Sequence, residues 1–240
     1  FDANELVNHG LVELTRSPAR LGGTTLTNHG VLRGTGQIDA RLDNCPGGEV
    51  RVGNGERLAI TEAGNANAGQ LEVFAGELEA AQGLDNTGVL TGSDAVLRLT
   101  GGLANTGSLL LTAGTNHLYG DANNAADGSI LVTGGASVTC HDDVHNAGEF
   151  TLRGASAGVF LDAYSGQGID GNGTAYFEGD LGPGHSPGRA TFGGDVILRS
   201  TARLVAEIAG TRPGDEYDVL EAAGSVALDG ELAASVLHGF

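Results

Sequence analysis

The stretch that decides the fold is LDNTGVLTGSDAVLRLTGGLANTGSLLL, residues 84–111. It contains the pattern apolar-x-Asn-x-Gly-x-apolar twice, first around Asn86 and again nineteen residues later around Asn105. A second apolar patch, Leu97 and Leu99, lies between the two copies. The stretch therefore indicates a short unit that repeats, and repeats of this length are typical of solenoid proteins.

The same element recurs on both sides of this stretch. The asparagines that carry it are Asn8, Asn28, Asn44, Asn67, Asn86, Asn105 and Asn146. Their glycines, together with a looser copy Ala126-Asp127-Gly128, stand at positions 10, 30, 48, 69, 88, 107, 128 and 148, so each unit is 18–21 residues long. The copy at Asn44 is also looser, because its glycine comes four residues later instead of two.

The residues after each glycine alternate between apolar and polar, as Leu71 and Val73 do around Glu72. Alternation with a period of two indicates a β-strand with one buried face. A unit of about 20 residues cannot bury that face alone, whereas stacked copies bury it in a continuous core. The sequence thus predicts an all-β parallel β-helix solenoid with coils of about 20 residues, in which Leu71, Leu90 and Leu109 lie in one file.

Asparagine and glycine each have an expected role at the corner of the coil. Stacked asparagine side chains can hydrogen-bond to the copies one coil above and below, as amide ladders do in cross-β structures. The seven asparagines are therefore predicted to form a structural ladder. The glycine that follows is expected to provide a positive φ at the turn. A β-sandwich is the alternative fold, but it does not require a steady register with asparagine at one phase.

The pattern divides the chain into repeats over residues 1–180 and a β-rich continuation of the solenoid over residues 181–240. Residues 184–192, GHSPGRATF, and Tyr217-Asp218-Val219-Leu220 resemble distal segments of autotransporter passenger domains and of filamentous-haemagglutinin-like secreted bacterial proteins. Gly34-Thr35-Gly36-Gln37-Ile38-Asp39 and the similar segment at 166–171 resemble an element that recurs in the same group. The resemblance implies a right-handed β-helix, secretion, and a location outside the cell or at the cell surface.

Composition excludes several classes of protein. The chain has 12 Lys and Arg against 30 Asp and Glu, for a net charge of −18, so we expect no nucleic-acid partner. No apolar run approaches the length of about 20 residues that crosses a bilayer, so no membrane span is predicted in this segment. Glycine supplies 42 of 240 residues, which disfavours a helical bundle.

Four residues form the polar cluster with the best ligand chemistry: His141, Asp142, Asp143 and His145. They are weak candidates for a divalent metal, because alternate side chains of a strand face opposite ways. His9 and His29 occupy the same phase in adjacent coils and are expected to stack about 5 Å apart. We predict no dedicated cofactor, and only loosely bound Ca²⁺ on the acidic surface.

Two glycine-rich motifs imitate catalytic or nucleotide-binding signatures. Gly184-His185-Ser186-Pro187-Gly188 matches a nucleophile elbow, but Pro187 has no N–H for an oxyanion hole. The segment 166–171 matches Gly-x-Gly-x-x-Gly, but turn and strand residues follow it where a dinucleotide site needs a helix. Neither motif predicts catalysis, and the chain is not expected to be an enzyme.

The chain has two cysteines, Cys45 and Cys140, which belong to coils five repeats apart. Five strand spacings separate them by about 24 Å, and a disulfide needs Cα atoms within about 7 Å. We therefore predict no disulfide within one molecule. The thiols are expected to be free or to bridge between molecules.

Three functions remain open from the sequence. The first is a structural extracellular rod, filament subunit or adhesin shaft, with end-to-end contacts to copies of itself or with flanking parts of a longer chain, because repeat sequence runs to both ends without capping segments. The second is a β-helical polysaccharide lyase or glycosidase. The third is a module that binds surface glycans through excursions near residues 113–124 and 155–168.

Overall fold

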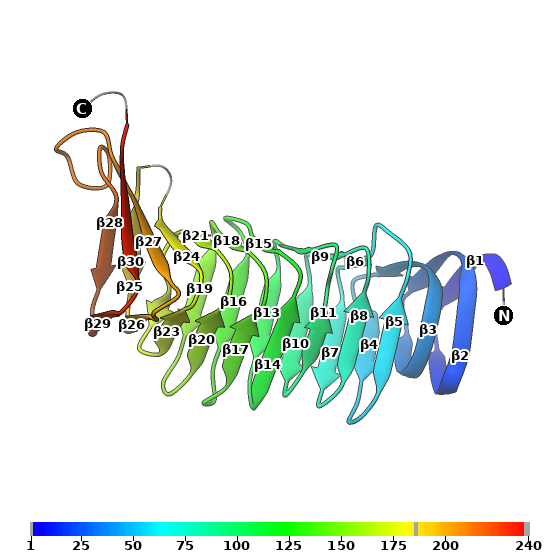
Figure 1. The fold of residues 1–240 in the computed structure, drawn as a ribbon. Helices are drawn as coiled ribbons and strands as arrows, with labels where there is room; N and C mark the ends of the chain where they lie inside the picture. Colours follow the sequence, from blue (N-terminus) through cyan, green and yellow to red (C-terminus); the bar gives the residue numbers. More distant parts are fainter. Residues whose placement is uncertain (1, 185–186, 238–240) are drawn as a thin grey trace.

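The chain forms a β-solenoid of about ten turns in the computed structural model, which describes residues 2–184 and 187–237. Figure 1 shows the coils as a row of parallel strands that follow the sequence from one end of the rod to the other. No α-helix occurs in the described residues, and hence none that could cross a membrane. The predicted all-β parallel solenoid with coils of about 20 residues is confirmed.

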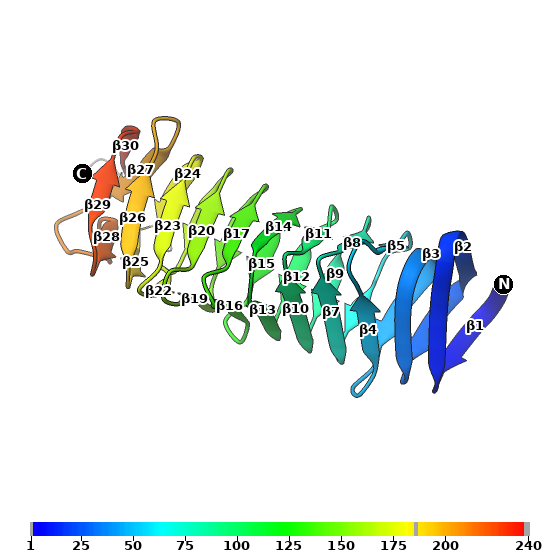
Figure 2. The ribbon, with the colours of Figure 1, turned by 90° about the horizontal axis from the view of Figure 1, so that it is seen from below.

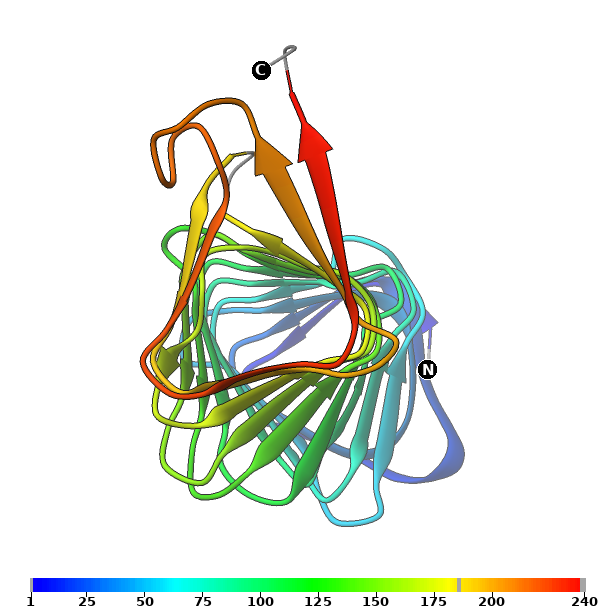
Figure 3. The ribbon, with the colours of Figure 1, turned by 60° about the vertical axis from the view of Figure 1, so that its left-hand side comes forward.

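The chain begins with β1 (Asp2–Asn8), a strand of 7 residues. The next two strands, β2 (Leu11–Asn28) and β3 (Val31–Asn44), are long and turn corners without a break. From residue 49 onward most coils have three short strands, which give the rod three faces, visible when it is viewed closer to its axis in Figure 3. The strands of each face pair in parallel with the equivalent strands of neighbouring coils, which the view in Figure 2 shows as a regular row.

Face 1 follows the asparagine corner. Its strands are β4 (Glu49–Val52), β7 (Gln70–Phe74), β10 (Val89–Ser93), β13 (Ser108–Leu111), β16 (Ser129–Val132), β19 (Glu149–Leu152) and β22 (Asp170–Gly171). Face 2 comprises β5 (Arg57–Ile60), β8 (Glu77–Ala80), β11 (Val96–Arg98), β14 (Thr115–Tyr119), β17 (Ser137–Cys140), β20 (Ala157–Phe160), β23 (Thr174–Phe177), β26 (Asp195–Leu198) and β29 (Val226–Leu228).

Face 3 leads into the asparagine corner. Its strands are β6 (Ala66–Asn67), β9 (Leu84–Asn86), β12 (Leu103–Asn105), β15 (Ala122–Asn124), β18 (Val144–Asn146), β21 (Tyr164–Gly166), β24 (Asp180–Pro183), β27 (Arg203–Ile208) and β30 (Glu231–Val236). The segments 113–124 and 155–168, which the sequence suggested as excursions, thus contain regular strands of Faces 2 and 3.

The core consists of vertical files of like residues. Leu71 pairs with Leu90 and Leu90 pairs with Leu109, and all three side chains are at most 1 % exposed. The same file continues to Ile130 and Phe150. The predicted file is therefore confirmed, and burial of its apolar side chains is the main force that holds the coils together.

After residue 180, some strands continue the stack of coils and others form a separate pair. Strands β26 and β29 continue Face 2, and β27 and β30 continue Face 3. Strands β25 (Arg189–Phe192) and β28 (Val219–Ala222) form a separate parallel pair. Figure 3 shows β27 and β30 projecting beyond the outline of the preceding coils.

The explanation expected for the corner glycines is wrong. None of the eight glycines at positions 10 to 148 that define the repeat has a positive φ. From the second of them onward, a Cβ atom would lie 2.2–2.3 Å from a carbonyl oxygen of an earlier coil. Glycine is needed there because two backbones approach closely, a different requirement from left-handed geometry.

Candidate functional site

The asparagine corner is an unbroken ladder of buried amides. The Nδ2 atom of each asparagine donates to the Oδ1 atom of the next one, from Asn8 through to Asn146, at 2.7–2.8 Å. All eight side chains are at most 6 % exposed. Each Nδ2 atom also donates to a backbone carbonyl, for example that of Val89 from Asn67 at 3.1 Å. The seven predicted asparagines all take part.

The eighth member, Asn124, is one that sequence reasoning missed. It accepts from Asn105 and donates to Asn146, both at 2.8 Å. Its glycine, Gly128, lies four residues on, the same spacing as between Asn44 and Gly48. That shared spacing was the signal available in the sequence.

Tyr164 ends the ladder. Asn146 Nδ2 donates to the Tyr164 hydroxyl at 3.1 Å, and the hydroxyl donates to the carbonyl of Gln167 at 2.9 Å. The side chain is fully buried, and burial raises the pKa of the phenol far above its usual value. A neutral hydroxyl therefore takes the place of the next amide, and the rings of Phe160 and Phe177 pack edge-on against the Tyr164 ring in the core.

The four residues proposed for a metal do not converge. Asp142 accepts from the backbone N–H of Gly120 at 2.7 Å, and Asp143 accepts from that of Ala163 at 3.1 Å. His145 is 3.1 Å from the Ser165 hydroxyl, whereas His141 contacts a different coil. Both carboxylates thus hold turns of neighbouring coils, and the described residues contain no group of three or more His, Cys, Asp or Glu side chains around one point.

His141 belongs instead to a column on Face 2. Its ring stacks on Tyr119 with centroids 3.9 Å apart, and the Arg98 guanidinium lies over the other side of Tyr119, 4.2 Å from the ring centroid. His117 Nδ1 lies 3.0 Å from His141 Nε2. The expected stack of His9 on His29 is also present, with centroids 5.0 Å apart and rings inclined by 6°. Arg98 pairs in register with Tyr119, whereas His117 pairs with Thr139 and reaches His141 diagonally. The varying coil length hid His117 from the sequence analysis.

The column predicts a pH dependence of stability. Burial, followed by His117, lowers the pKa of His141. The folded state then binds a proton less readily than the unfolded state, so stability falls as the pH drops below about 6.5, the ordinary histidine value. We expect His141→Phe, which keeps a ring on Tyr119 but cannot titrate, to flatten the decline in melting temperature between pH 7.5 and 5.5 relative to wild type.

The exposed His9 provides the control for this experiment. His9→Phe retains the column on Face 2 and should leave the slope of melting temperature against pH unchanged. Equal slopes for wild type and His141→Phe would contradict the assignment of the decline to His141.

Both cysteines are free, in different surroundings. Cys140 is 4 % exposed in the file between Leu118 and Phe160, and burial raises the pKa of its thiol to about 12. Cys45 is half-buried at an asparagine corner. A bridge between molecules therefore stays a prediction for Cys45 alone, because Cys140 cannot reach another molecule while the core is closed.

Thiol titration tests this difference. We expect an aromatic disulfide reagent to modify one thiol per folded molecule and both thiols after unfolding in denaturant. Cys45→Ser should abolish the reaction of the folded protein, and Cys140→Ala should preserve it. A folded Cys45→Ser variant that still reacts promptly would show that Cys140 is accessible.

The structure describes one of the two catalytic-looking motifs in full and the other only in part. His185 and Ser186 of the elbow-like motif lie outside the described residues. Segment 166–171 has positive φ values at Gly166 and Gly171, and it runs from the last residue of β21 through β22, with no helix before β23. Asn172, which follows it, accepts from the Gly154 backbone N–H at 2.7 Å. These contacts give the segment a role in turning the chain.

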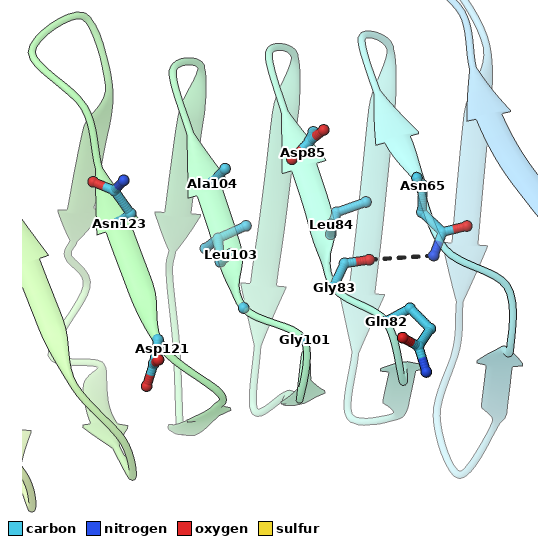
Figure 4. Close-up of a pocket in the computed structure, with 12 residues that line it drawn as sticks. Asn65, Gln82, Gly83, Leu84, Asp85, Gly101, Leu103, Ala104, Asp121 and Asn123 are labelled. Atoms are coloured by element: carbon cyan, nitrogen blue, oxygen red, sulfur yellow. Dashed lines mark hydrogen bonds between the residues drawn. The ribbon is translucent and has the colours of Figure 1, made fainter.

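A recess opens on the outer side of Face 3, and Figure 4 shows its lining side chains. Its volume is about 400 Å³. It lies across β9, β12 and β15, with Asp85 and Asn123 on its two sides and Ala104 between them. Gln82 and Asp121 come from the turns that lead into the first and last of these strands.

Comparisons with protein-family models, with curated proteins and with solved structures give no match. The geometry described above is thus the basis for any assignment of function.

Proposed function

We propose that the chain is a structural shaft of an extracellular bacterial protein, a rigid rod that carries or spaces other parts at the cell surface. The observation that carries the proposal is the unbroken amide ladder from Asn8 to Tyr164 alongside continuous apolar files. In this arrangement the buried polar groups hydrogen-bond one coil to the next, which makes the stack of coils rigid, as a structural rod requires.

The surface chemistry agrees with this role. A net charge of −18 keeps rods soluble and apart, and many outward arginines are paired with acids of the same or the adjacent coil, as Arg33 is with Glu13 at 2.9 Å. The segments at 184–192 and 217–220 that resemble autotransporter passengers support secretion. The polar residues that first suggested a metal hold turns or contact neighbouring coils, a use that suits a scaffold.

Two measurements on the natural protein test the proposal. Antibodies raised against the purified chain should label intact producing cells as strongly as permeabilised ones, because the shaft lies outside the membrane. The purified protein should release no reducing ends from plant or bacterial polysaccharides. Labelling only after permeabilisation would overturn the surface location, and steady release of reducing ends would favour the lyase or glycosidase alternative.

A further inference from the structure

The recess on Face 3 exists because the coil that contains β12 carries no outward side chain larger than a methyl group along the strand and at the two positions before it. Ala104 pairs in register with Asp85 on one side and with Asn123 on the other, and all three residues point outward and are exposed. Two strand spacings, about 9.6 Å, therefore separate the outer two backbones. Between them only a methyl group rises from the sheet, so a slot one side-chain layer wide runs along β12.

The turn before β12 extends the slot. Gly101 and Gly102 have no side chains, and Gly102 has a φ of +96°, which favours glycine. A Cβ at Gly101 would lie 2.2 Å from the carbonyl carbon of Gln82, so this turn lies tightly against the preceding coil. Gln82 and Asp121 stand on either side of it (Figure 4). The volume of the whole recess, about 400 Å³, falls within the range of about 300–1,000 Å³ typical of small-molecule sites.

Five polar side chains line the slot, and one of them, Asn65, donates to the Gly83 carbonyl at 3.2 Å. The other four have no hydrogen-bond or ionic partner among the described residues: Gln82, Asp85, Asp121 and Asn123. Further along the same outward row, one pair of polar groups does make contact, since His145 Nδ1 lies 3.1 Å from the Ser165 hydroxyl. Two carboxylates supply acceptors, and two amides supply both donors and acceptors. The floor is the methyl group of Ala104 and glycine backbone.

We propose that this slot binds one ring of a neutral glycan, with ring hydroxyls bonded to both walls and a C–H face on Ala104. Sugar hydroxyls donate to carboxylates and both donate to and accept from amides, so they match this set of groups. Asp85, Asp121 and the net charge of −18 disfavour sulfated or uronic-acid glycans. The slot is open to solvent and has no aromatic platform in its lining, so we expect binding in the millimolar range. The proposal adds ligand recognition to the shaft but does not require the surface location.

Amide chemical shifts of the ¹⁵N-labelled protein provide the test. The probes are cellobiose, lactose and N,N′-diacetylchitobiose, with digalacturonate as the anionic comparison and Ca²⁺ as a separate titration. We expect at least one neutral disaccharide to shift amides around residues 82–85, 101–104 and 121–123 in a saturable way, and digalacturonate to bind at least tenfold more weakly.

Two variants locate the effect in the slot. Ala104→Phe fills it and should weaken binding at least tenfold, whereas Ser165→Phe, on the same outward row but two coils beyond Asn123 and outside the recess, should leave the affinity unchanged. Asn123→Ala removes one wall amide with little risk to folding, because that side chain is exposed, and should also weaken binding severalfold.

Several outcomes would overturn the proposal. These are the absence of saturable shifts with all neutral probes, shifts outside the recess, equal binding to Ala104→Phe, and a response of the recess to Ca²⁺ but not to sugars. Surface labelling tests the shaft separately, so failure of one proposal is distinguishable from failure of the other.

Discussion

Asn124→Ala is expected to lower the free energy of unfolding by about 2–6 kcal/mol. The substitution removes the donor of two hydrogen bonds, to Asn146 Oδ1 at 2.8 Å and to the Glu149 carbonyl at 3.0 Å. It also removes the acceptor of a third, from Asn105 Nδ2 at 2.8 Å. It leaves the Asn146 Oδ1 atom without its partner in the ladder, at a place where Asn124 and Asn146 are both 0 % exposed. Each buried polar group that loses its partner costs about 1–3 kcal/mol, and the expected range counts the two buried side-chain groups, Asn105 Nδ2 and Asn146 Oδ1. Urea denaturation followed by circular dichroism measures the change.

Asn123→Ala is the matched control, one residue away on the same strand. The Asn123 side chain points outward and is exposed, so its removal should change stability by no more than about 0.5 kcal/mol. Asn124→Leu separates polarity from packing, because it fills the space but still leaves the neighbouring amides unpaired. Asn124→Leu should therefore remain destabilising, and a neutral effect of either Asn124 variant would contradict a stabilising ladder.

The architecture could be predicted from the sequence because every coil of the solenoid repeats the same pattern of apolar, polar, Asn and Gly residues. The alternation around Leu71 indicates the buried face of a strand, and the position of Asn86 indicates a corner. Because nearly identical copies recur, each copy supports the interpretation of the others. Asn124 escaped because the corner loop there has two extra residues between Asn and Gly. Those residues close a tight turn, with Gly128 N donating to Ala125 O at 2.8 Å, just as Gly48 N donates to Cys45 O at 2.8 Å. The ladder is unaffected, since the turn absorbs the insertion.

The candidate site was harder to foresee, because it depends on which outward residues are neighbours. Coil lengths vary, so the side-chain contact of His117 with His141 and the position of Ala104 between Asp85 and Asn123 depend on the exact register. A sequence reading that follows the buried face assigns no neighbours on the outer face. The recess is also defined by missing side chains, at Ala104 and two glycines, and such gaps leave no positive signal in a sequence.

Gly107→Ala is expected to cost more than about 3 kcal/mol, or to prevent folding, although it adds only one methyl group. The new Cβ would lie 2.3 Å from the carbonyl oxygen of Gly88 and 2.6 Å from the carbonyl carbon of Thr87. Both atoms belong to the backbone of the preceding coil and cannot rotate away. Relief requires the two coils to separate, which would stretch the bond from Ser108 N to Gly88 O, now 2.8 Å long.

Gly10→Ala provides the opposite expectation at the same phase of the repeat. No atom lies within 4 Å of a Cβ built on Gly10, and its φ is not positive. Alanine there reduces the entropy of the unfolded chain, so stability should be unchanged or rise by about 0.4–1 kcal/mol. Denaturation midpoints of the two variants therefore move apart if close approach of coils is what the corner glycine provides. If the glycine served turn geometry instead, both substitutions would destabilise the protein to a similar degree, and the account of the corner given by the stacked coils would be wrong.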